Sequence, residues 1–441
     1  MTKWSLSYEM LRVVIRQFFQ NFYRKIESDG LENIPDNKPT IFAANHQNAL
    51  MDPWGILFTS KQQTVFLTRA DIFNNPILLK IFTFFKMLPI YRIRDGKESL
   101  KKNEEIFNKS IEILEANMSL GLFPEATHTN KRHLRPLKKA VPRIAFQAEI
   151  NNNYELDLTI IPVGIYYDDY VHSNSNLFVN YGKPIKIKQF KKEFEENEQK
   201  GFNALKVKLE EEIKPLIIHE PDMQHYDLYE GIRTYYRNTM LQKLNLKSNL
   251  LKNRFKADKV TVDRLKNYFI DQDNSISNLD TAFNQFNTFC NKKGISTIDT
   301  KKPISFISII YNSLLFLLGL PIFIFAFINN AIYYKLLMKF LVSVKDKQFH
   351  TSIKSVVTLL LTFVIYPIQA AILWAISGNG QWALVYLVLL PLTALFANKY
   401  RYKFNDFKNK LIFWKLIKSK DYKEYTAKKG NMDKILIKVM S

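Results

Sequence analysis

Short apolar runs alternate with longer segments of helical periodicity between residues 30 and 215. The runs that predict strands are TIFAA (40–44), TVFLT (64–68), MLPIYRI (87–93), LGLFPEA (120–126), LTIIPVGIYY (158–167) and NLFVNYG (176–182). Between them, apolar side chains recur at helical spacing near 53–60, 75–86, 97–118, 137–149 and 188–215. Strands that alternate with helices are typical of an α/β fold. We therefore predict an α/β domain with a mixed sheet over residues 30–215.

The first 29 residues carry a different pattern. Apolar side chains recur at helical spacing from Trp4 to Ile26, and basic residues such as Arg12 and Arg16 interrupt them. This pattern predicts an amphipathic helix that lies on a membrane surface or packs on the α/β domain, rather than one that spans a bilayer. Residues 216–302 are polar and rich in Lys and Asn, and they predict a helical linker region without a recognisable motif.

Two long runs near the C-terminus contain no charged residue. They extend from Pro303 to Tyr334 and from Ser355 to Asn398. The second run would be roughly 66 Å long as a helix, enough for two crossings of a hydrocarbon core about 30 Å thick. The stretch SGNGQW (377–382) interrupts it. We therefore predict two spans, at about 355–376 and 380–398.

The first charge-free run is too long for one upright crossing and too short for two, because it would reach roughly 48 Å as a helix. GLP at 319–321 interrupts it, and Lys335 and Lys339 follow. The positive-inside bias would place these lysines on the cytoplasmic side together with the Lys/Arg-rich residues 399–441. We therefore expect a broken hairpin or re-entrant pair across 303–343. Residues 303–398 are predicted to be membrane-embedded helices and 399–441 a basic cytoplasmic tail.

The formal net charge of +22 changes the list of expected partners. Such an excess indicates nucleic acid, anionic lipid or phosphorylated substrates. Nucleic acid would not explain the apolar runs, and the sequence contains no recognised nucleic-acid-binding motif. A transport path is also disfavoured, because the apolar runs contain almost no ionisable residue. The single cysteine, Cys290, excludes an intrachain disulfide and a Cys-based metal cluster, and the first residues predict no secretory signal peptide.

The stretch NHQNALMDPW (45–54) allows two interpretations of His46 and Asp52. In the structural one, Asp52 is the N-cap of a helix with Pro53 at its first position, and His46 fills a turn. In the chemical one, Asp52 accepts the Nδ1–H of His46 and holds the imidazole as a general base. The two are compatible, because a capping carboxylate has a second oxygen.

Two further stretches carry charged residues at predicted strand ends. In PIYRIRDG (89–96), Arg92 and Arg94 share one face of a strand, where they form either a phosphate-binding pair or a solvated edge. In LGLFPEATHTNKRHLRPLKKA (120–140), Glu125 and Thr127 follow an apolar strand and precede a basic stretch that includes Lys138. Open α/β sheets bind ligands at the carboxyl ends of their strands.

Together these motifs resemble the glycerolipid acyltransferase family, the 1-acylglycerol-3-phosphate acyltransferases and their glycerol-3-phosphate acyltransferase relatives. The resemblance covers about residues 25–215. It is carried, in the family's order, by GLENIP, NHQNALMDP, PIYRIRDG, FPEATHT, LRPLKKAVPRIAFQA, IPVGIYY and NYGKPI. It implies an α/β acyltransferase domain, to which the chain adds the helical linker and a C-terminal α-helical membrane region.

The resemblance also implies roles for individual residues. His46 would be the general base and Asp52 its orienting partner. The substrate-binding residues would be Arg92 for the glycerol phosphate, Glu125 and Thr127 for the acceptor, and Pro162 on the acyl-donor side; Arg94 and Lys138 are added here on their charge.

The sequence departs from the family pattern at two points. Five residues separate His46 from Asp52 where the family most often has four. The same spacing occurs in a subgroup that resembles the fungal glycerol-3-phosphate acyltransferases, which favours glycerol 3-phosphate slightly. Ala126 stands where the family has glycine, and it would be strained if that position requires a positive φ.

The implied function is transfer of a fatty acyl group from a thioester donor, acyl-CoA or acyl carrier protein, to a hydroxyl of glycerol 3-phosphate or 1-acylglycerol 3-phosphate (lysophosphatidate). We expect direct attack without an acyl-enzyme, because Cys290 lies outside the motifs and no serine in them has a recognisable base beside it. Neither a cofactor nor a metal is expected. We expect a multi-pass membrane protein of phospholipid synthesis whose catalytic domain lies on the cytoplasmic face, bound to anionic lipids and not to nucleic acid. The alternative is a catalytically silent family member or a basic membrane scaffold.

Overall fold

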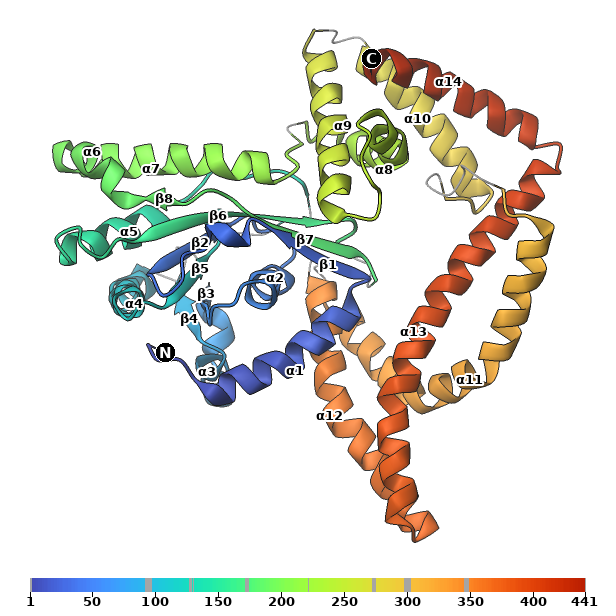
Figure 1. Cartoon of the computed structure of the whole chain (residues 1–441), viewed down its shortest axis with the longest axis horizontal. Helices are drawn as coiled ribbons and strands as arrows, with labels where there is room; N and C mark the ends of the chain where they lie inside the picture. Colours follow the sequence, from blue (N-terminus) through green and yellow to red (C-terminus); the bar gives the residue numbers. More distant parts are fainter. Residues whose placement is uncertain are drawn as a thin grey trace. The chain divides into compact units, whose positions relative to one another are not determined.

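The computed structural model describes residues 2–91, 97–126, 129, 131–170, 174–220, 222–271, 275–296, 303–344 and 349–440. The chain forms two compact units (Figure 1). The first consists of Met1–His219 with Asp346–Ser352, and the second of Glu220–Lys345 with Ile353–Ser441.

The first unit is built on an eight-stranded mixed sheet, as the alternating pattern predicts. Its strands are β1 (Lys25–Asp29), β2 (Thr40–Ala44), β3 (Val65–Arg69), β4 (Met87–Ile90), β5 (Ser119–Leu122), β6 (Thr159–Tyr167), β7 (Asn176–Tyr181) and β8 (Ile185–Lys186). The order is β1-β7-β6-β2-β5-β3-β4, with β8 on β6. The strand pairs are parallel except that β6 pairs with β7 and β8 in the antiparallel sense.

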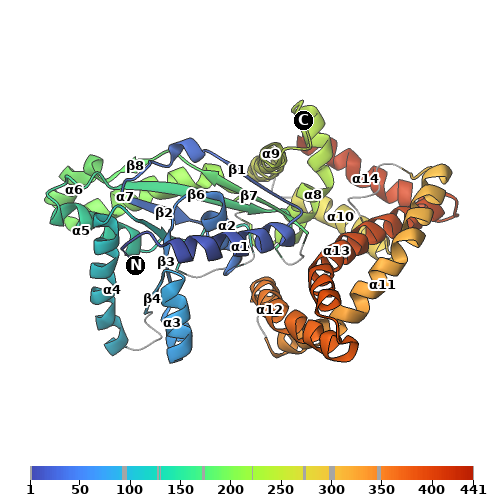
Figure 2. The ribbon, with the colours of Figure 1, turned by 60° about the horizontal axis from the view of Figure 1, so that its bottom comes forward.

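Helices cover both faces of this sheet, which explains why strands such as β2 are buried throughout. The helices are α1 (Leu6–Phe22), α2 (Met51–Thr59), α3 (Pro76–Phe84), α4 (Lys97–Glu115), α5 (Ala140–Asn151), α6 (Lys191–Glu196) and α7 (Glu198–Ile213). Short 3₁₀ turns lie at Leu31–Asn33, Ala70–Phe73, Ile187–Phe190 and Lys214–Leu216. Residues of α4, α5 and α7 pack on the face that carries Ile41 and Leu120. On the other face, α1 lies beside α2 (Figure 2). The rings of Phe19 and Trp54 pack edge to face between them.

The N-terminal helix is therefore shorter than the predicted segment 1–29. It ends at Phe22, and β1 follows and pairs in parallel with β7. Its buried side chains are Tyr8, Ile15 and Phe19. Of the two predicted positions, the structure shows the packing of α1 on the α/β domain.

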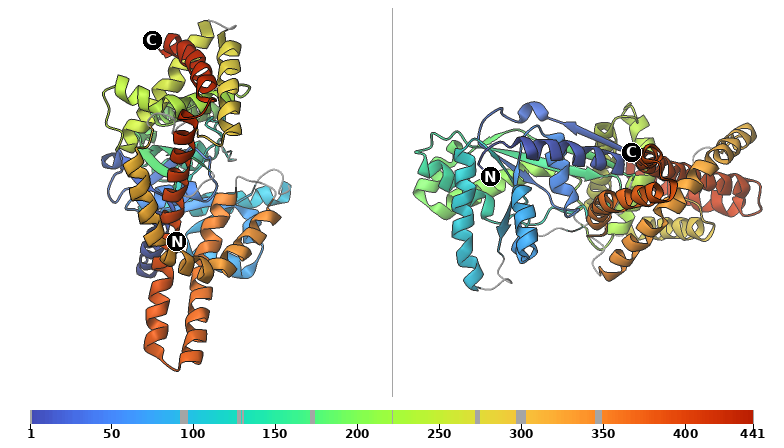
Figure 3. Two further views of the ribbon diagram at one scale, coloured as in Figure 1. Left: turned by 90° about the vertical axis from the view of Figure 1, so that its right-hand side faces the viewer. Right: turned by 90° about the horizontal axis from the view of Figure 1, so that it is seen from below.

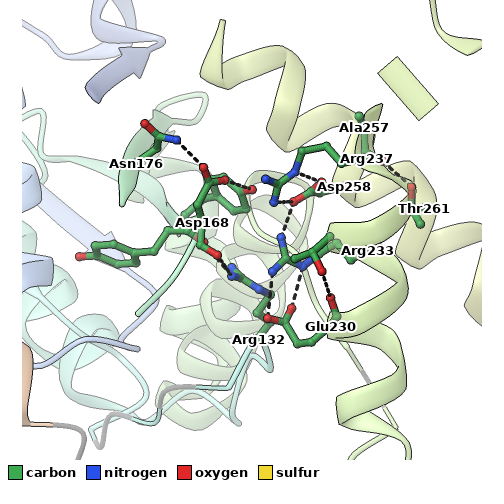
Figure 4. A network of polar contacts seen from close by, with 12 residues as sticks. Arg132, Asp168, Asn176, Glu230, Arg233, Arg237, Ala257, Asp258 and Thr261 are labelled. Carbon is green, nitrogen blue, oxygen red and sulfur yellow. Dashed lines mark hydrogen bonds and ion pairs between the residues drawn. The ribbon is translucent and has the colours of Figure 1, made fainter. Parts of the chain in front are cut away.

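The second unit is helical. It contains α8 (Tyr226–Lys243), α9 (Leu251–Asp271), α10 (Ser275–Lys292), α11 (Phe306–Ser343), α12 (His350–Ser377, of which the first residues belong to the first unit), α13 (Gly380–Ile417) and α14 (Tyr422–Met440). Buried charges tie α8 to α9, because Arg233 and Arg237 both bind the buried carboxylate of Asp258 (Figure 4). The described part of 216–302, predicted as a helical linker, contains the helices α8, α9 and α10.

Three of these helices are long and apolar enough to cross a membrane: Phe306–Val342, His350–Ser377 and Gly380–Ile417. The two spans predicted at 355–376 and 380–398 lie inside α12 and α13, which a short turn joins and which run in opposite directions (Figure 3). The predicted break between them is present, since Gly378 has a φ of +66° and Asn379 caps α13. Hydrogen bonds from Tyr366 and Tyr386 to Asn330 and Asn329 join α12 and α13 to α11.

The predicted hairpin or re-entrant pair across 303–343 is wrong. Residues Phe306–Ser343 form one helix that continues through Pro321. The GLP stretch instead allows close packing, because a Cβ on Gly319 would lie 3.0 Å from the ring of Tyr400 in α13. Tyr400 also donates a 2.8 Å hydrogen bond to the carbonyl of Phe316, in the turn before the proline. Neighbouring helices commonly satisfy backbone groups near a proline in this way.

Residues 399–441 also differ from the expected tail. The first part continues α13 to Ile417, and the rest forms α14, whose Met432 and Leu436 are fully buried. The basic residues therefore lie on folded helices. Their apolar neighbours recur at helical spacing, which explains why this charged segment packs instead of remaining extended.

Candidate active site

The candidate site lies where three neighbouring parallel strands end. In the sheet β2 is flanked by β6 and β5, and all three run in the same direction. The loop that carries His46 follows β2, Glu125 lies just beyond β5, and Tyr167 is the last residue of β6. The helix after β2 covers one face of the sheet and the helix after β5 covers the other. In open α/β sheets this arrangement creates a crevice at the carboxyl ends of the strands.

His46 and Asp52 are in direct contact. Nδ1 of His46 lies 2.8 Å from Oδ2 of Asp52, whose side chain is fully buried, whereas that of His46 is 17% exposed. The amides of Gln47 and Asn48 each donate a 2.7 Å hydrogen bond to the same oxygen. Because this oxygen receives amide donors, it acts as an acceptor, and Nδ1 of a neutral imidazole carries the proton. Nε2 then holds the lone pair, as a general base requires.

Asp52 is not the helix N-cap that its position before Pro53 predicts. Helix α2 begins at Met51, and Leu50 is its N-cap residue. Asp52 lies in the first turn, and its carboxylate reaches back to the preceding loop instead of forward into the helix. Pro53 is tolerated there because the first amides of a helix have no intrahelical acceptor.

A second hydrogen bond and a ring contact fix the pair. The hydroxyl of Tyr167 donates to Oδ1 of Asp52 at 2.8 Å. Burial, and then the adjacent charge of Asp52, raise the pKa of this hydroxyl well above its usual value, so it remains a donor. The His46 ring stacks on Phe123, with ring centroids 4.2 Å apart and an interplanar angle of 20°. These contacts restrain both the carboxylate and the imidazole.

Glu125 connects the site to the next loop. Its Oε1 accepts from the amide of His46 at 2.8 Å and its Oε2 from the amide of Arg135 at 3.0 Å. Burial raises the pKa of the Glu125 carboxyl to about 7, against the opposing effect of the two amide hydrogen bonds. Ala126, which follows, has a φ of +60°, so the substituted position does require the left-handed conformation. Both carboxylate oxygens of Glu125 thus accept hydrogen bonds from backbone amides.

Residues 25–166 match the protein family described as Acyltransferase. A chloroplastic 1-acyl-sn-glycerol-3-phosphate acyltransferase of Brassica napus is 28% identical over 125 residues, 28% of this chain and 34% of that protein. A 1-acyl-sn-glycerol-3-phosphate acyltransferase of Borreliella burgdorferi is 26% identical over 161 residues, 36% of this chain and 59% of that protein. Residues 25–166 are therefore similar to the Acyltransferase family, and both relatives are 1-acyl-sn-glycerol-3-phosphate acyltransferases.

The alignments cover only part of these acyltransferases, about a third of the Brassica protein and about three fifths of the Borreliella protein. The crystal structure of the 1-acyl-sn-glycerophosphate (LPA) acyltransferase of Thermotoga maritima aligns with 21% identity and a TM-score of 0.34, over 46% of this chain and 80% of that one. The family match ends at residue 166, within β6. The membrane-capable helices therefore lie outside the matched acyltransferase segment.

The acyltransferase domain brings some of the predicted site residues together and leaves others apart. His46, Asp52 and Glu125 share one loop network. Lys138 is exposed, and its amide donates to the carbonyl of Pro124 at 2.7 Å. Pro162 is buried within β6, paired with Ala43 of β2, and not at the strand end. Arg92, Arg94 and Thr127 lie outside the described residues.

Several residues of the candidate site were not predicted from the sequence. Tyr167 contacts Asp52, and the side chain of Asn45 pairs with the backbone of Ile165, donating at 3.1 Å and accepting at 2.7 Å. Asn45 thereby extends the β2–β6 pairing to the residue before His46. Arg132 is buried, donates to the carbonyl of Tyr167 at 2.7 Å and lies over the ring of Tyr170. For Tyr167, the available signal in the sequence was the pair of tyrosines that ends IPVGIYY. For Arg132, it was a basic stretch that looks like a solvent-exposed surface.

Proposed function

We propose that this protein is a membrane-bound O-acyltransferase that esterifies glycerol 3-phosphate or 1-acylglycerol 3-phosphate in phospholipid synthesis. The observation that carries the proposal is the contact of His46 Nδ1 with the buried Asp52 at the carboxyl edge of the sheet. The family of the domain and the names of its relatives support acyl transfer to a phosphorylated glycerol. Three apolar helices support membrane association.

In the proposed reaction, Nε2 of His46 removes the proton of the acceptor hydroxyl as its oxygen attacks the thioester carbonyl. The tetrahedral intermediate collapses, the C–S bond breaks, and the thiolate takes the proton back from the imidazolium. General-base assistance of this kind contributes roughly 10²–10⁴-fold to the rate. Asp52 holds the imidazole in the productive tautomer and stabilises its charged form.

Direct attack is favoured over an acyl-enzyme on cysteine. Cys290 is buried in α10, and burial raises the pKa of its thiol to about 11. A thiol of that kind is a poor nucleophile, because the reactive form is the thiolate. The acyl donor, acyl-CoA or acyl carrier protein, is therefore proposed to react in one transfer step that needs no cofactor.

For the acceptor, we propose that Arg92 and Arg94 bind the phosphate, since guanidinium groups bind phosphate bidentately, and that Thr127 also contributes to acceptor binding. Glu125 takes a different role from the one expected, because both of its oxygens hold amides. It positions His46 and joins it to the basic stretch that begins after Ala126. Lys138 is exposed and is proposed to contribute charge at the surface.

The membrane arrangement extends the same proposal. We propose a multi-pass protein whose acyltransferase domain lies on the cytoplasmic face, where thioester donors are available. The net charge of +22 favours anionic lipid near that surface, at about 1 kcal/mol for each well-placed Lys or Arg. Acceptors with an acyl chain would reach the site from the bilayer.

The proposal is tested with membranes that contain the full chain, a labelled acyl-CoA or acyl carrier protein donor, and one acceptor at a time. The acceptors are glycerol 3-phosphate, dihydroxyacetone phosphate and lysophosphatidate. We expect esterification of glycerol 3-phosphate or lysophosphatidate at a rate well above that of membranes without the protein. Equal rates in both membranes with every acceptor would contradict the proposal and favour a silent family member or a scaffold.

A further inference from the structure

The loop of residues 45–51, called here the His46 loop, is held by its backbone amides. The amide of His46 donates to Glu125, and those of Gln47 and Asn48 donate to Asp52. These acceptors belong to the site already described. The amide of Leu50 differs, because it donates at 3.1 Å to the hydroxyl of Ser352, more than 300 residues away in the sequence. One amide of the His46 loop thus donates to a residue outside the site already described.

Ser352 lies in the first turn of α12, the membrane-capable helix that begins at His350. This turn belongs to the first unit and is buried in it, with Thr351 3% and Ser352 6% exposed. The hydroxyl of Thr351 donates to the carbonyl of Tyr170 at 2.8 Å. The same carbonyl accepts from the side chain of Asn48 at 3.3 Å. Two hydroxyls of α12 therefore contact the His46 loop or its direct partner.

A third contact holds the same segment. The guanidinium of Arg69, at the end of β3, lies over the ring of Phe349 at 5.8 Å from its centroid. A guanidinium in this position is attracted by the electron-rich face of the ring. Residues 349–352 are thus fixed to the acyltransferase domain by a ring contact and two hydrogen bonds.

The His46 loop needs external support. Ala49 has a φ of +40°, a backbone conformation that is unfavourable for residues other than glycine. Leu50 is the N-cap residue of α2, but its side chain makes no capping hydrogen bond. Strained backbone persists only where its surroundings hold it in place. The Ser352 hydroxyl supplies one of these restraints, next to the strained residue.

We propose that Thr351 and Ser352 are positioning residues for the general base, so that the first turn of α12 sets the geometry of the His46 loop. This inference rests on the proposed function. The residues that would hold the His46 loop are thus the first residues of an apolar, membrane-capable helix. When this turn is seated, the imidazole holds its productive position; when it is displaced, the loop relaxes and transfer slows.

The first test compares the transfer rates of full-length variants in membranes. Ser352→Ala removes the acceptor for the Leu50 amide, and we expect its kcat to fall about tenfold with unchanged KM values. Thr351→Val should lower kcat in the same direction, and Ser352→Thr, which keeps a hydroxyl, should restore most of the rate. The control is Thr362→Val, since the Thr362 hydroxyl bonds only to the Thr358 carbonyl of its own helix among the contacts seen here. Wild-type kcat in both Ser352→Ala and Thr351→Val would overturn the proposal.

The second test does not depend on activity. Hydrogen exchange of the full chain in detergent micelles measures the protection of peptides that cover residues 46–51. We expect faster exchange there in Ser352→Ala and wild-type exchange in Thr362→Val. Unchanged exchange in Ser352→Ala would contradict the contact. If the wild-type protein transfers no acyl group, the proposed function fails, whereas the exchange result still decides whether α12 supports the loop.

Discussion

The hydroxyl of Tyr167 donates to Oδ1 of Asp52 at 2.8 Å, while Oδ2 of the same carboxylate contacts Nδ1 of His46. Tyr167 ends β6 and His46 follows β2, and these strands are neighbours in the sheet. The contact therefore joins the candidate base to the strand on the side opposite Glu125. The Asp52 carboxylate is fully buried. If the Tyr167 hydroxyl were removed, Oδ1 of Asp52 would lose this hydrogen bond.

Tyr167→Phe should slow acyl transfer without unfolding the domain. Hydrogen bonds to charged groups contribute about 1.5–3 kcal/mol, which corresponds to a kcat roughly ten- to a hundredfold lower if the bond is used fully in the transition state. Tyr166→Phe is a matched control, because the Tyr166 hydroxyl bonds to Asp168 and not to Asp52. Steady-state rates of the two variants check the prediction, and equal loss in both would argue against a specific role for Tyr167.

The Glu125 carboxyl should give the stability of the protein a pH dependence of defined sign. Its pKa is raised from 4.5 to about 7, so the folded state binds the proton more tightly than the unfolded state. The contribution of Glu125 to stability is therefore full below pH 4.5 and declines as the pH rises to about 7. The shift corresponds to a decline of about 3 kcal/mol at most.

Thermal unfolding in detergent between pH 5 and 8 measures this effect as the difference between wild type and Glu125→Gln. We expect the variant to be least stable relative to wild type near pH 5, and the difference to shrink as the pH rises. Glu105→Gln is the control, because the pKa of the exposed Glu105 is lowered and its difference should be flat above pH 5. A difference for Glu125→Gln that is independent of pH would contradict the assigned pKa.

Ala126→Gly should stabilise the protein. Ala126 has a φ of +60°, where a residue with a Cβ is disfavoured by about 1–2 kcal/mol and glycine is not. Glycine loses more chain entropy on folding, so we expect a net gain of roughly 0.5–1 kcal/mol. Thermal unfolding checks it. Ala148→Gly, in the middle of α5, should instead lower stability by about 1 kcal/mol or more, and a lower Tm in both variants would refute the strain at Ala126.

The strands and most helices of the first unit follow from the sequence because their signals are local. Runs such as TIFAA and LTIIPVGIYY are apolar over the length of one strand, and β2 and β6 lie within one residue of the predicted bounds. β1 was not predicted, because the apolar helical pattern of the N-terminal helix continues to Ile26, inside this strand. Only its parallel pairing with β7, which joins residues about 150 positions apart, makes KIESD a strand.

The wrong predictions for Asp52 and for α11 share one cause. The dipeptide Asp52–Pro53 predicts a cap, but the carboxylate bonds to loop amides and to Tyr167, which is 115 residues away. GLP predicts a break in α11, but Tyr400 of α13 packs against Gly319 and accommodates it. In both cases a contact between distant residues decides between local alternatives. The His46–Asp52 contact was foreseen only because the chemical interpretation was kept beside the structural one.

The most direct test of the account is acyl transfer by His46→Ala in membranes that contain the same amount of full-length protein as the wild type. His225→Ala is a matched control, because His225 forms a second His–Asp contact, with Nδ1 2.6 Å from Oδ2 of Asp222, that lies outside the acyltransferase motifs. We expect His46→Ala to remain in the membrane fraction and to lose roughly 10²–10⁴-fold in rate, whereas His225→Ala keeps the wild-type rate. Transfer by His46→Ala at the wild-type rate would contradict the assignment of His46 as the general base.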